Sequence, residues 1–412
     1  MQKMFTRKGW YPSIGTGGMG IDFVNKPEYI AEITHAGLLP TMSAVILALG
    51  NPEYREKLFG PREQRIIRNR TRFARQKNIE VLLDRIKKMR ELNPYGIVAI
   101  NLMHAVGDYK EMVEAIGNAG EKNEKGEVIG NGIDILVVGA GMPRDLGTDM
   151  LRFPHMKYIP IVSSAKAAKF MLLFAKKNKG RLPDGFYIEH PDTAGGHLGK
   201  RNVEDSGFDP VQTITELRQI IKDFYGENVH VPVIYGGGVS YREDIDRALE
   251  WGYDSVNIGT RALLTKESGM PDDIILTYYL NADKVETNLK SPAGLPSNAI
   301  PNPEMSAMDR AKDIVKDCIS CIKTCQYLDA AKEALKAGKE KVITESYCIA
   351  DKLSMTRHGL KGGLLFSGKG LEIIKNDILY RNQKTGEAVI PHIRQMIEFI
   401  LNPENKRPTI TG

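Results

Sequence analysis

The sequence predicts an α/β protein: a closed (β/α)8 TIM barrel followed by a mostly helical C-terminal extension. Short apolar runs alternate with helical segments as far as Thr260, and several runs are nearly continuous β-branched and apolar residues, as in Ile133–Val138. Such runs are typical of strands that are buried on both faces of a parallel sheet. Eight strand–helix units within about 260 residues fit a closed barrel better than an open doubly wound sheet.

The eight expected strands follow from these apolar runs. They are Tyr11–Thr16, Leu38–Ser43, Ile97–Asn101, Ile133–Val138, Tyr158–Ser163, Gly185–Glu189, Val231–Tyr235 and Ser255–Ile258. Apolar residues at helical spacing predict amphipathic helices between them, most clearly at Ala165–Asn178, Val211–Phe224 and Tyr241–Glu250. The charged interval 51–92 is too long for one connection, so we expect a helical insertion there.

The alternation stops after Thr260. We therefore expect a barrel domain at residues 1–264 and a mostly helical extension at 265–412, packed on the substrate side of the barrel. Within the extension, Ser291–Pro303 is rich in proline and asparagine and predicts a loop, whereas Asp309–Gly338 has a long helical pattern. The extension has few aromatic residues, which favours docking on the barrel over an independent core.

Composition narrows the class of protein. Hydrophobic residues make up 42% of the 412 residues and charged residues 26%, which is ordinary for a soluble globular chain. The net charge of +6 is not concentrated in a basic stripe with interleaved aromatic residues, so we expect no nucleic-acid partner. No apolar run approaches the length of a membrane span and no secretory signal is recognisable, so we expect a cytoplasmic protein without a membrane partner.

The first loop, Gly15–Gly20, matches the dinucleotide pattern G-x-G-x-x-G letter for letter. That pattern also requires an acidic residue about 20 residues further on, at the end of the second strand. The corresponding segment, His35–Pro40, contains no carboxylate. We therefore reject a dinucleotide site and expect a glycine-rich loop whose backbone amides bind the edge of a flat heterocycle.

Two further glycine clusters follow the last two strands. Gly236–Gly238 comes directly after the seventh strand, and Gly259–Thr260 follows the eighth. In TIM barrels the loops after these strands commonly bind phosphate through backbone N–H groups. Together with the bare backbone at Gly195 and Gly196, this predicts a phosphorylated planar cofactor, and FMN fits both parts.

His197 is the main catalytic candidate. It lies in Ala194–Gly199, just after the sixth strand, and glycines on both sides leave room for a ligand. Its imidazole ordinarily titrates near neutrality, which suits proton transfer over a flat ligand. His190 is a second candidate base in the same segment, but we favour the interpretation that it caps the strand or bonds to Asp192.

These motifs, in this order along the chain, resemble the nitronate monooxygenase (2-nitropropane dioxygenase-like) family, whose close relatives include flavin-dependent enoyl-acyl-carrier-protein (enoyl-ACP) reductases. The residues that carry the resemblance lie in eight segments. They are Gly17–Gly20, Ile100–Met103, Val162–Ser164, Ala194–Gly199, Gly236–Gly238, Asn257–Arg261, Ser291–Pro296 and Tyr347–Ala350.

The resemblance implies an FMN-dependent oxidoreductase and a set of cofactor-binding residues. These are Gly17, Gly18, Met19 and Asn101 at the flavin ring, Ser163, Gly195 and Gly196 beside the cofactor, and Gly237, Gly238, Gly259 and Thr260 at the phosphate. His197 would act as catalytic base or orienting group. The chain departs from the family at Leu39–Pro40 and at Glu189–Thr193, so its substrate contacts are expected to differ more than its cofactor contacts.

The implied reaction is oxidation of alkyl nitronates with O2 to a carbonyl compound and nitrite. The alternative is an NAD(P)H-dependent flavin reductase of enoyl-ACP or quinone type. The expected partner is a small-molecule substrate, while use of NAD(P)H and a homo-oligomeric state are left open.

The four cysteines allow two interpretations. Cys318, Cys321 and Cys325 are followed at a distance by Cys348, which is compatible with a four-thiolate zinc or iron–sulfur site. The offsets of three, four and seven also describe one apolar face of a helix, where free cysteine packs as a small hydrophobe. We favour helix packing and assign no metal ligand, leaving the metal or cluster open.

Overall fold

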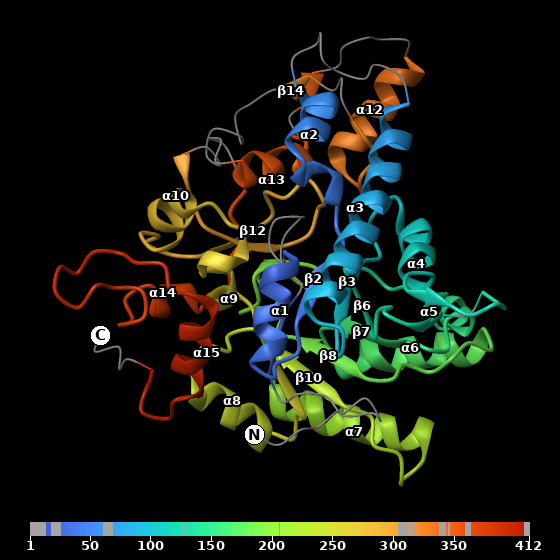
Figure 1. The fold of residues 1–412 in the computed structure, drawn as a ribbon, viewed down its shortest axis with the longest axis horizontal. Coiled ribbons are helices and arrows are strands. Elements are labelled where there is room, and N and C mark those ends of the chain that lie inside the picture. Colours follow the sequence, from blue (N-terminus) through green and yellow to red (C-terminus); the bar gives the residue numbers. More distant parts are fainter. Residues whose placement is uncertain are drawn as a thin grey trace.

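A computed structural model of the chain describes residues 14–17, 26–60, 69–126, 128–205, 207–303, 313–314, 318–337, 343–344, 347–358 and 364–407. Its centre is an eight-stranded parallel sheet in the order β1-β11-β10-β8-β7-β6-β3-β2 (Figure 1). The strands are β1 (Ile14–Thr16), β2 (Thr41–Ser43), β3 (Ala99–Met103), β6 (Ile135–Gly139), β7 (Lys157–Val162), β8 (Phe186–Glu189), β10 (Val233–Gly236) and β11 (Ser255–Ile258).

The sheet closes on itself between its first and second strands. Gly15 forms a parallel bridge with Leu39, and the backbone N–H of Thr16 donates to the Leu39 carbonyl over 2.9 Å. This closure confirms the predicted barrel, and each of the eight predicted strands overlaps an observed one. The expected start of the first strand, residues 11–13, lies outside the described residues.

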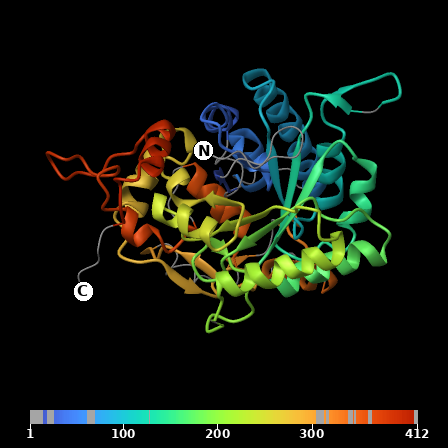
Figure 2. The ribbon, with the colours of Figure 1, turned by 90° about the horizontal axis from the view of Figure 1, so that it is seen from below.

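Helices surround the strands on the outside (Figure 2). Those that follow barrel strands are α1 (Pro27–His35), α3 (Arg70–Leu92), α4 (Tyr109–Gly117), α5 (Leu146–Asp149), α6 (Ala165–Lys177), α7 (Pro210–Tyr225), α8 (Arg242–Glu250) and α9 (Thr260–Leu263). Local sequence explains where two of them begin. The Ser164 hydroxyl accepts from Ala167 N–H before α6, and the Asp209 carboxylate accepts from Val211 N–H before α7. The interval 51–92 holds α2 (Pro52–Phe59) and α3, and α3 packs against α1 and α4.

Two apolar cores hold the barrel together. The inner one is small and consists of Leu39, Ala99, Ile135, Val137, Ile159, Tyr187 and Ile234, all in or next to the strands. The outer one lies between strands and helices and continues into the C-terminal part of the chain. Because side chains alternate along a strand, Asn101 and Glu189 project to the same side as Ala99 and Tyr187, toward the barrel interior. Polar groups therefore lie above the inner core at the carboxyl ends of the strands.

The C-terminal part contains short strands as well as helices. Its elements are α10 (Asp272–Ile274), the π-helix η5 (Ile275–Tyr279), β12 (Glu286–Asn288), β13 (Ser297–Ala299), β14 (Asp313–Ile314), α12 (Gln326–Lys336), β15 (Ile343–Thr344), α13 (Ile349–Arg357), α14 (Leu371–Ile374) and α15 (Ile393–Leu401). The remaining short elements are η1 (Leu47–Gly50), β4 (Glu121–Lys122), β5 (Val128–Gly130), η3 (Met150–Arg152), β9 (Gly196–His197) and η4 (Lys266–Ser268).

The predicted helix over Asp309–Gly338 is wrong in its first part. The helix α12 begins only at Gln326, and residues 318–325 are irregular chain. The backbone of this segment forms hydrogen bonds with another part of the chain. Gly107 N–H donates to the Cys321 carbonyl over 2.8 Å, and Val106 and Ile322 form an antiparallel bridge. These bonds to the loop after β3 replace the bonds that a helix would form. The cysteines therefore do not lie on one helix face. The predicted loop Ser291–Pro303 likewise contains the strand β13.

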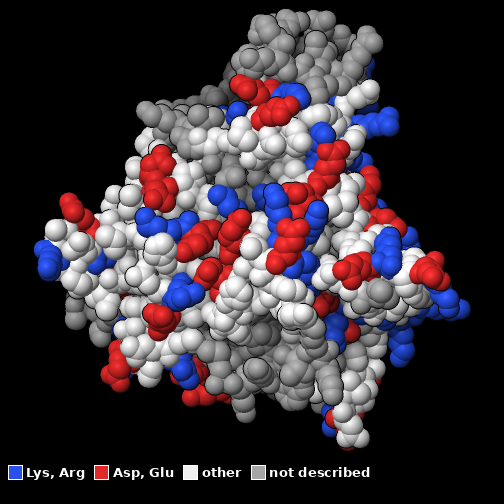
Figure 3. Space-filling view, in the orientation of Figure 1, with Lys and Arg blue, Asp and Glu red and all other residues white. Residues whose placement is uncertain are grey.

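Among the described residues, no helix is long and apolar enough to cross a membrane. On the face shown in Figure 3, basic and acidic side chains are interspersed and no large patch carries one sign of charge.

Candidate active site at the barrel mouth

His197 is held by residues that are far away in the sequence. It lies in β9, which pairs antiparallel with β13 of the C-terminal part. Its Nε2 is 2.5 Å from the hydroxyl oxygen of Ser291, and its ring centroid is 5.2 Å from that of Phe366. Burial lowers the pKa of His197 to about 4, so the imidazole is neutral at pH 7.

The loop that leads to His197 is fixed by a buried amide. Asn298, in β13, is fully buried, and its Nδ2 donates to the carbonyls of Asp192 and Ala194 over 2.8 and 2.7 Å. Its own Oδ1 accepts from the Thr287 hydroxyl at 2.6 Å. The barrel thus supplies the histidine, whereas the C-terminal part sets its position.

His190 faces a different environment. Its Nδ1 accepts from the backbone N–H of Asp192 over 3.1 Å, as expected, and its ring packs on Phe208 with centroids 4.5 Å apart. The ring also lies 6.4 Å from that of Tyr235, which belongs to the outer core. His190 therefore packs against aromatic residues of the outer core, on the outer side of the strands.

The glycines beside His197 differ in what surrounds them. A Cβ at Gly195 would lie 2.8 Å from the Gly368 nitrogen and 3.0 Å from the Ser367 carbonyl carbon. The absence of a side chain at Gly195 therefore lets the backbone of residues 367–368 pack closely against it. Gly196 has φ +77°, and its nearest neighbour in that direction is the Phe366 ring at 4.0 Å. The sequence interpretation attributed both glycines to a ligand, but Gly195 already has a protein neighbour on its Cβ side.

The glycine turn after β10 faces an unpartnered hydroxyl. Gly237 and Gly238 have φ of +106° and +78°, which side chains rarely adopt. Cβ atoms added there would lie 3.1 and 3.2 Å from the Thr193 Oγ1. That oxygen is buried and has no hydrogen-bond partner among the described residues. A buried polar group of this kind requires an explanation, which a bound water or a ligand would provide.

Thr260 and the C-terminal segment 366–370 complete this side of the mouth. The Thr260 Oγ1 accepts from the Gly368 N–H over 3.1 Å, and the Lys369 N–H donates to the Thr193 carbonyl over 3.2 Å. Gly259, just before α9, brings Thr260 to the end of β11. The four residues predicted at a phosphate, Gly237, Gly238, Gly259 and Thr260, therefore border one region.

Asn101 is the predicted contact on the opposite wall. It is 9% exposed and lies in β3, and its side-chain amide donates a long hydrogen bond, 3.4 Å, to the Val137 carbonyl. Directly after β1, a Cβ added at Gly17 would have one neighbour within 4 Å among the described residues, the Tyr187 hydroxyl at 3.9 Å. The predicted ring contacts Gly18 and Met19 lie outside the described residues.

Ser163 has a partner within the protein. Its hydroxyl donates to the Gly199 carbonyl over 2.7 Å, and a Cβ at Gly199 would lie 2.6 Å from the Ser163 Cβ. Ser163 therefore ties the end of β7 to the segment that follows His197.

Sequence reasoning gave no individual role to several residues at the mouth. Glu189 ends β8 on the interior side, and burial raises its pKa to about 7. Glu189 and Thr193 both belong to the segment 189–193, where the sequence departs from the family and altered substrate contacts were expected. Ser291 begins a segment that carries the family resemblance, but only the folded chain reveals its contact with His197. No local signal marks Asn298 or Phe366.

A sequence profile described as nitronate monooxygenase matches residues 3–380, nearly the whole chain. The chain belongs to the nitronate monooxygenase family. It is an oxidoreductase of a flavin-dependent family, and such enzymes act on small molecules. This confirms the family, the fold class and the type of enzyme that the sequence predicted. No curated protein matches the sequence.

Solved structures share the fold at low identity. FabK from Thermotoga maritima has a TM-score of 0.57 and 17% identity, over 94% of this chain and 91% of its own. The enoyl reductase domain of MlnA from Bacillus amyloliquefaciens has a TM-score of 0.57 and 9% identity, over 94% and 92%. A nitroalkane oxidase from Streptomyces ansochromogenes has a TM-score of 0.53 and 15% identity, over 87% and 90%. These likenesses concern the fold.

Proposed function

We propose that this chain is an FMN-dependent nitronate monooxygenase that converts alkyl nitronates and O2 into a carbonyl compound and nitrite. The observation that carries the proposal is the largely buried, neutral imidazole of His197 between the glycine turns of the barrel mouth. Family membership supports the same reaction.

The residues at the mouth fit FMN. The unpartnered Thr193 hydroxyl and the turn at Gly237 and Gly238 would hold the phosphate. Asn101 would contact the ring from the opposite wall, and Gly17 would contact it from the end of β1, next to β11. When bound, the flavin supplies the electron transfer, while the protein orients the substrate and excludes side reactions.

His197 would act as a general base. A histidine whose pKa is about 4 is neutral at pH 7, which supports a base that takes a proton from a neutral nitroalkane rather than an imidazolium that steadies an anion. When Nε2 donates its hydrogen to Ser291 Oγ, the lone pair on Nδ1 is free to accept that proton. The Phe366 ring packs against the imidazole at an interplanar angle of 56°.

The alternative is an NAD(P)H-dependent flavin reductase of enoyl-ACP or quinone type. The full-length likeness in fold to the MlnA enoyl reductase domain favours it as a second candidate. Anaerobic mixing separates the two: we expect propyl-2-nitronate to bleach the flavin rapidly and NADH to bleach it slowly. Rapid bleaching by NADH without bleaching by the nitronate would overturn the first choice.

A variant pair in one loop tests the histidine. His197→Asn should retain flavin and lower turnover about 10²–10⁴-fold, the usual contribution of a positioned acid or base. His190→Asn is the matched control, because an asparagine oxygen can still accept from Asp192 N–H, and its turnover should stay near that of the parent. Equal turnover of the two variants would remove His197 from the mechanism.

The same proposal assigns the remaining parts. Residues 1–264 would form the flavin domain and 265–412 an extension on the substrate side, which is supported by the contacts of Ser291 and Phe366 with His197. A cytoplasmic location, use of NAD(P)H and a homo-oligomeric state stay predictions.

A further inference from the structure

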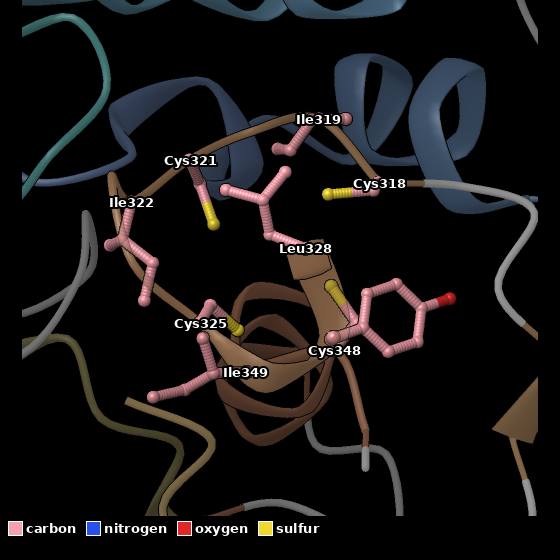
Figure 4. A pocket seen from close by; sticks show the side chains of 9 residues that line it. Cys318, Ile319, Cys321, Ile322, Cys325, Leu328, Cys348 and Ile349 are labelled. Carbon is pink, nitrogen blue, oxygen red and sulfur yellow. The ribbon is translucent and has the colours of Figure 1, made fainter. Parts of the chain in front are cut away.

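All four cysteines of the chain line one pocket outside the barrel mouth (Figure 4). Cys318, Cys321 and Cys325 come from the irregular segment before α12, and Cys348 directly precedes α13. In Figure 4 the four sulfur atoms face a common space, with isoleucine and leucine side chains around it. None of the four forms a disulfide.

Helix packing no longer explains this arrangement. The spacing of three, four and seven residues would align the cysteines on a helix, but residues 318–325 are not helical. Their backbone is instead held by Gly107 N–H on the Cys321 carbonyl and by Lys323 N–H on the Ala105 carbonyl, at 2.8 and 2.7 Å. Tertiary hydrogen bonds, and not packing of one helix face, therefore bring the thiols together.

Backbone donors point at the sulfur atoms. The Ser320 N–H donates to Cys318 Sγ over 3.4 Å. Backbone N–H groups of Tyr327 and Leu328 are directed at Cys325, and that of Asp351 is directed at Cys348. Such N–H groups stabilise sulfur that carries negative charge, as metal-bound thiolate does.

A single metal ion does not fit these thiols. One zinc ion needs its sulfur ligands about 2.3 Å from a common point. Within the described part of the chain, no three histidine, cysteine or acidic side chains are arranged to hold one ion. A cluster reaches its four thiolates through several irons, so its ligands stand further apart. The apolar surroundings suit a cluster as well, because they exclude solvent.

We propose that Cys318, Cys321, Cys325 and Cys348 hold an iron–sulfur cluster. The cluster lies beside the barrel mouth. The Gln326 N–H donates to the Pro292 carbonyl over 3.1 Å, and the Tyr347 hydroxyl donates to the Lys290 carbonyl over 2.7 Å. Ser291, the partner of His197, lies between these two anchored residues, so the cluster also stabilises the segment that positions the histidine.

The test uses the full-length chain, purified without oxygen and, in parallel, reconstituted with ferrous iron and sulfide. We expect about two to four irons per chain with equal acid-labile sulfide, as clusters held by four cysteine thiolates contain. We also expect a broad visible absorption that persists after the flavin is removed. Zinc without sulfide, or no bound metal after reconstitution, would overturn the proposal.

Variants locate the site. Cys321→Ser and Cys348→Ser should each lose the iron and the absorption, whereas Thr324→Ala, an exposed change in the same segment, should keep both. Flavin absorption and far-ultraviolet circular dichroism report whether each variant folds. If a serine variant does not fold, alkylation of the parent decides: iron loading should protect the thiols, and equal labelling of loaded and iron-free chain would contradict the assignment.

Discussion

Two of the buried contacts that join the C-terminal part of the chain to the barrel differ in character. At the first, the fully buried Arg261 donates through Nη2 to the Asp377 carboxylate and through Nε to the Ser240 carbonyl. The Tyr241 hydroxyl donates to the same carboxylate over 2.7 Å, and the guanidinium lies 4.9 Å from the centre of the Phe399 ring. At the second junction, four thiols and apolar side chains meet the loop after β3.

The two junctions differ in whether the chain itself supplies a charged partner or leaves room for a bound metal. The charge of Arg261 is balanced by the Asp377 carboxylate of the chain itself, so the first junction needs no ligand for charge balance. The second gathers four potential metal ligands around an apolar space. Changes at the first junction should therefore act on stability alone, and changes at the second should depend on metal.

The largest expected effect is that of Asp377→Ala. It leaves the Arg261 charge buried without a counterion, which should lower the free energy of unfolding by about 3–5 kcal/mol. Urea denaturation measures this. Asp246→Ala removes the half-exposed partner of Arg242 and is the control, with an expected loss of about 0–1 kcal/mol. Equal losses of unfolding free energy in the two variants would mean that the buried Arg261–Asp377 pair contributes no more than the exposed Arg242–Asp246 pair.

Iron loading should affect only the second junction. A ligand at 100 times its dissociation constant stabilises the folded state by about 2.7 kcal/mol. We expect a gain of this order when the iron-free chain is reconstituted, measured by thermal unfolding. The gain should be the same in Asp377→Ala, because sites without shared partners act additively. A gain that vanishes in this variant would show that the junctions are coupled.

Tyr241→Phe should weaken the first junction without breaking it. It removes a hydrogen bond to a carboxylate, and such bonds contribute about 1.5–3 kcal/mol. The ring stays in place over Arg261, so the loss should be smaller than for Asp377→Ala. Urea denaturation of both variants and of the double variant gives the coupling; a loss as large as that of Asp377→Ala would show that the hydroxyl, not the ion pair, dominates.

The smallest expected effect concerns Glu189 at the barrel mouth, which belongs to neither junction. The pKa of Glu189 is about 7 in the folded chain, above the ordinary 4.5, so this carboxyl stabilises the fold below pH 4.5 and the contribution is lost as pH rises through 7. Glu189→Gln should then be more stable than the parent at pH 8, by about 1 kcal/mol after screening, and equally stable near pH 4. Unfolding at both pH values, with the exposed Glu216→Gln as control, checks the sign.

Local patterns predicted the barrel but not the junctions. Each strand is a short apolar run, and its burial on both faces can be recognised from a few neighbouring residues. The glycine turns after β10 and β11 were predictable for the same reason. The hydroxyl of Ser291 and the imidazole of His197 come from positions 94 residues apart, and no local pattern reports such a meeting.

The cysteine segment shows how a correct spacing can mislead. Offsets of three, four and seven residues are compatible with a helix, and the sequence contains nothing that forbids one before Gln326. The backbone bonds between 321–323 and 105–107 decide otherwise, because tertiary hydrogen bonds outweigh a weak local preference.

The pairing of β9 with β13 also matters for how specificity can change. His197 lies in β9, and β9 pairs with β13 of the C-terminal part. The C-terminal part, and not the barrel, therefore sets the orientation of the histidine. Exchanging residues 286–300 for those of a relative would re-aim the imidazole while the eight parallel strands stay as they are. With the role proposed for His197, the choice of substrate could then diverge while the proposed cofactor site stays the same.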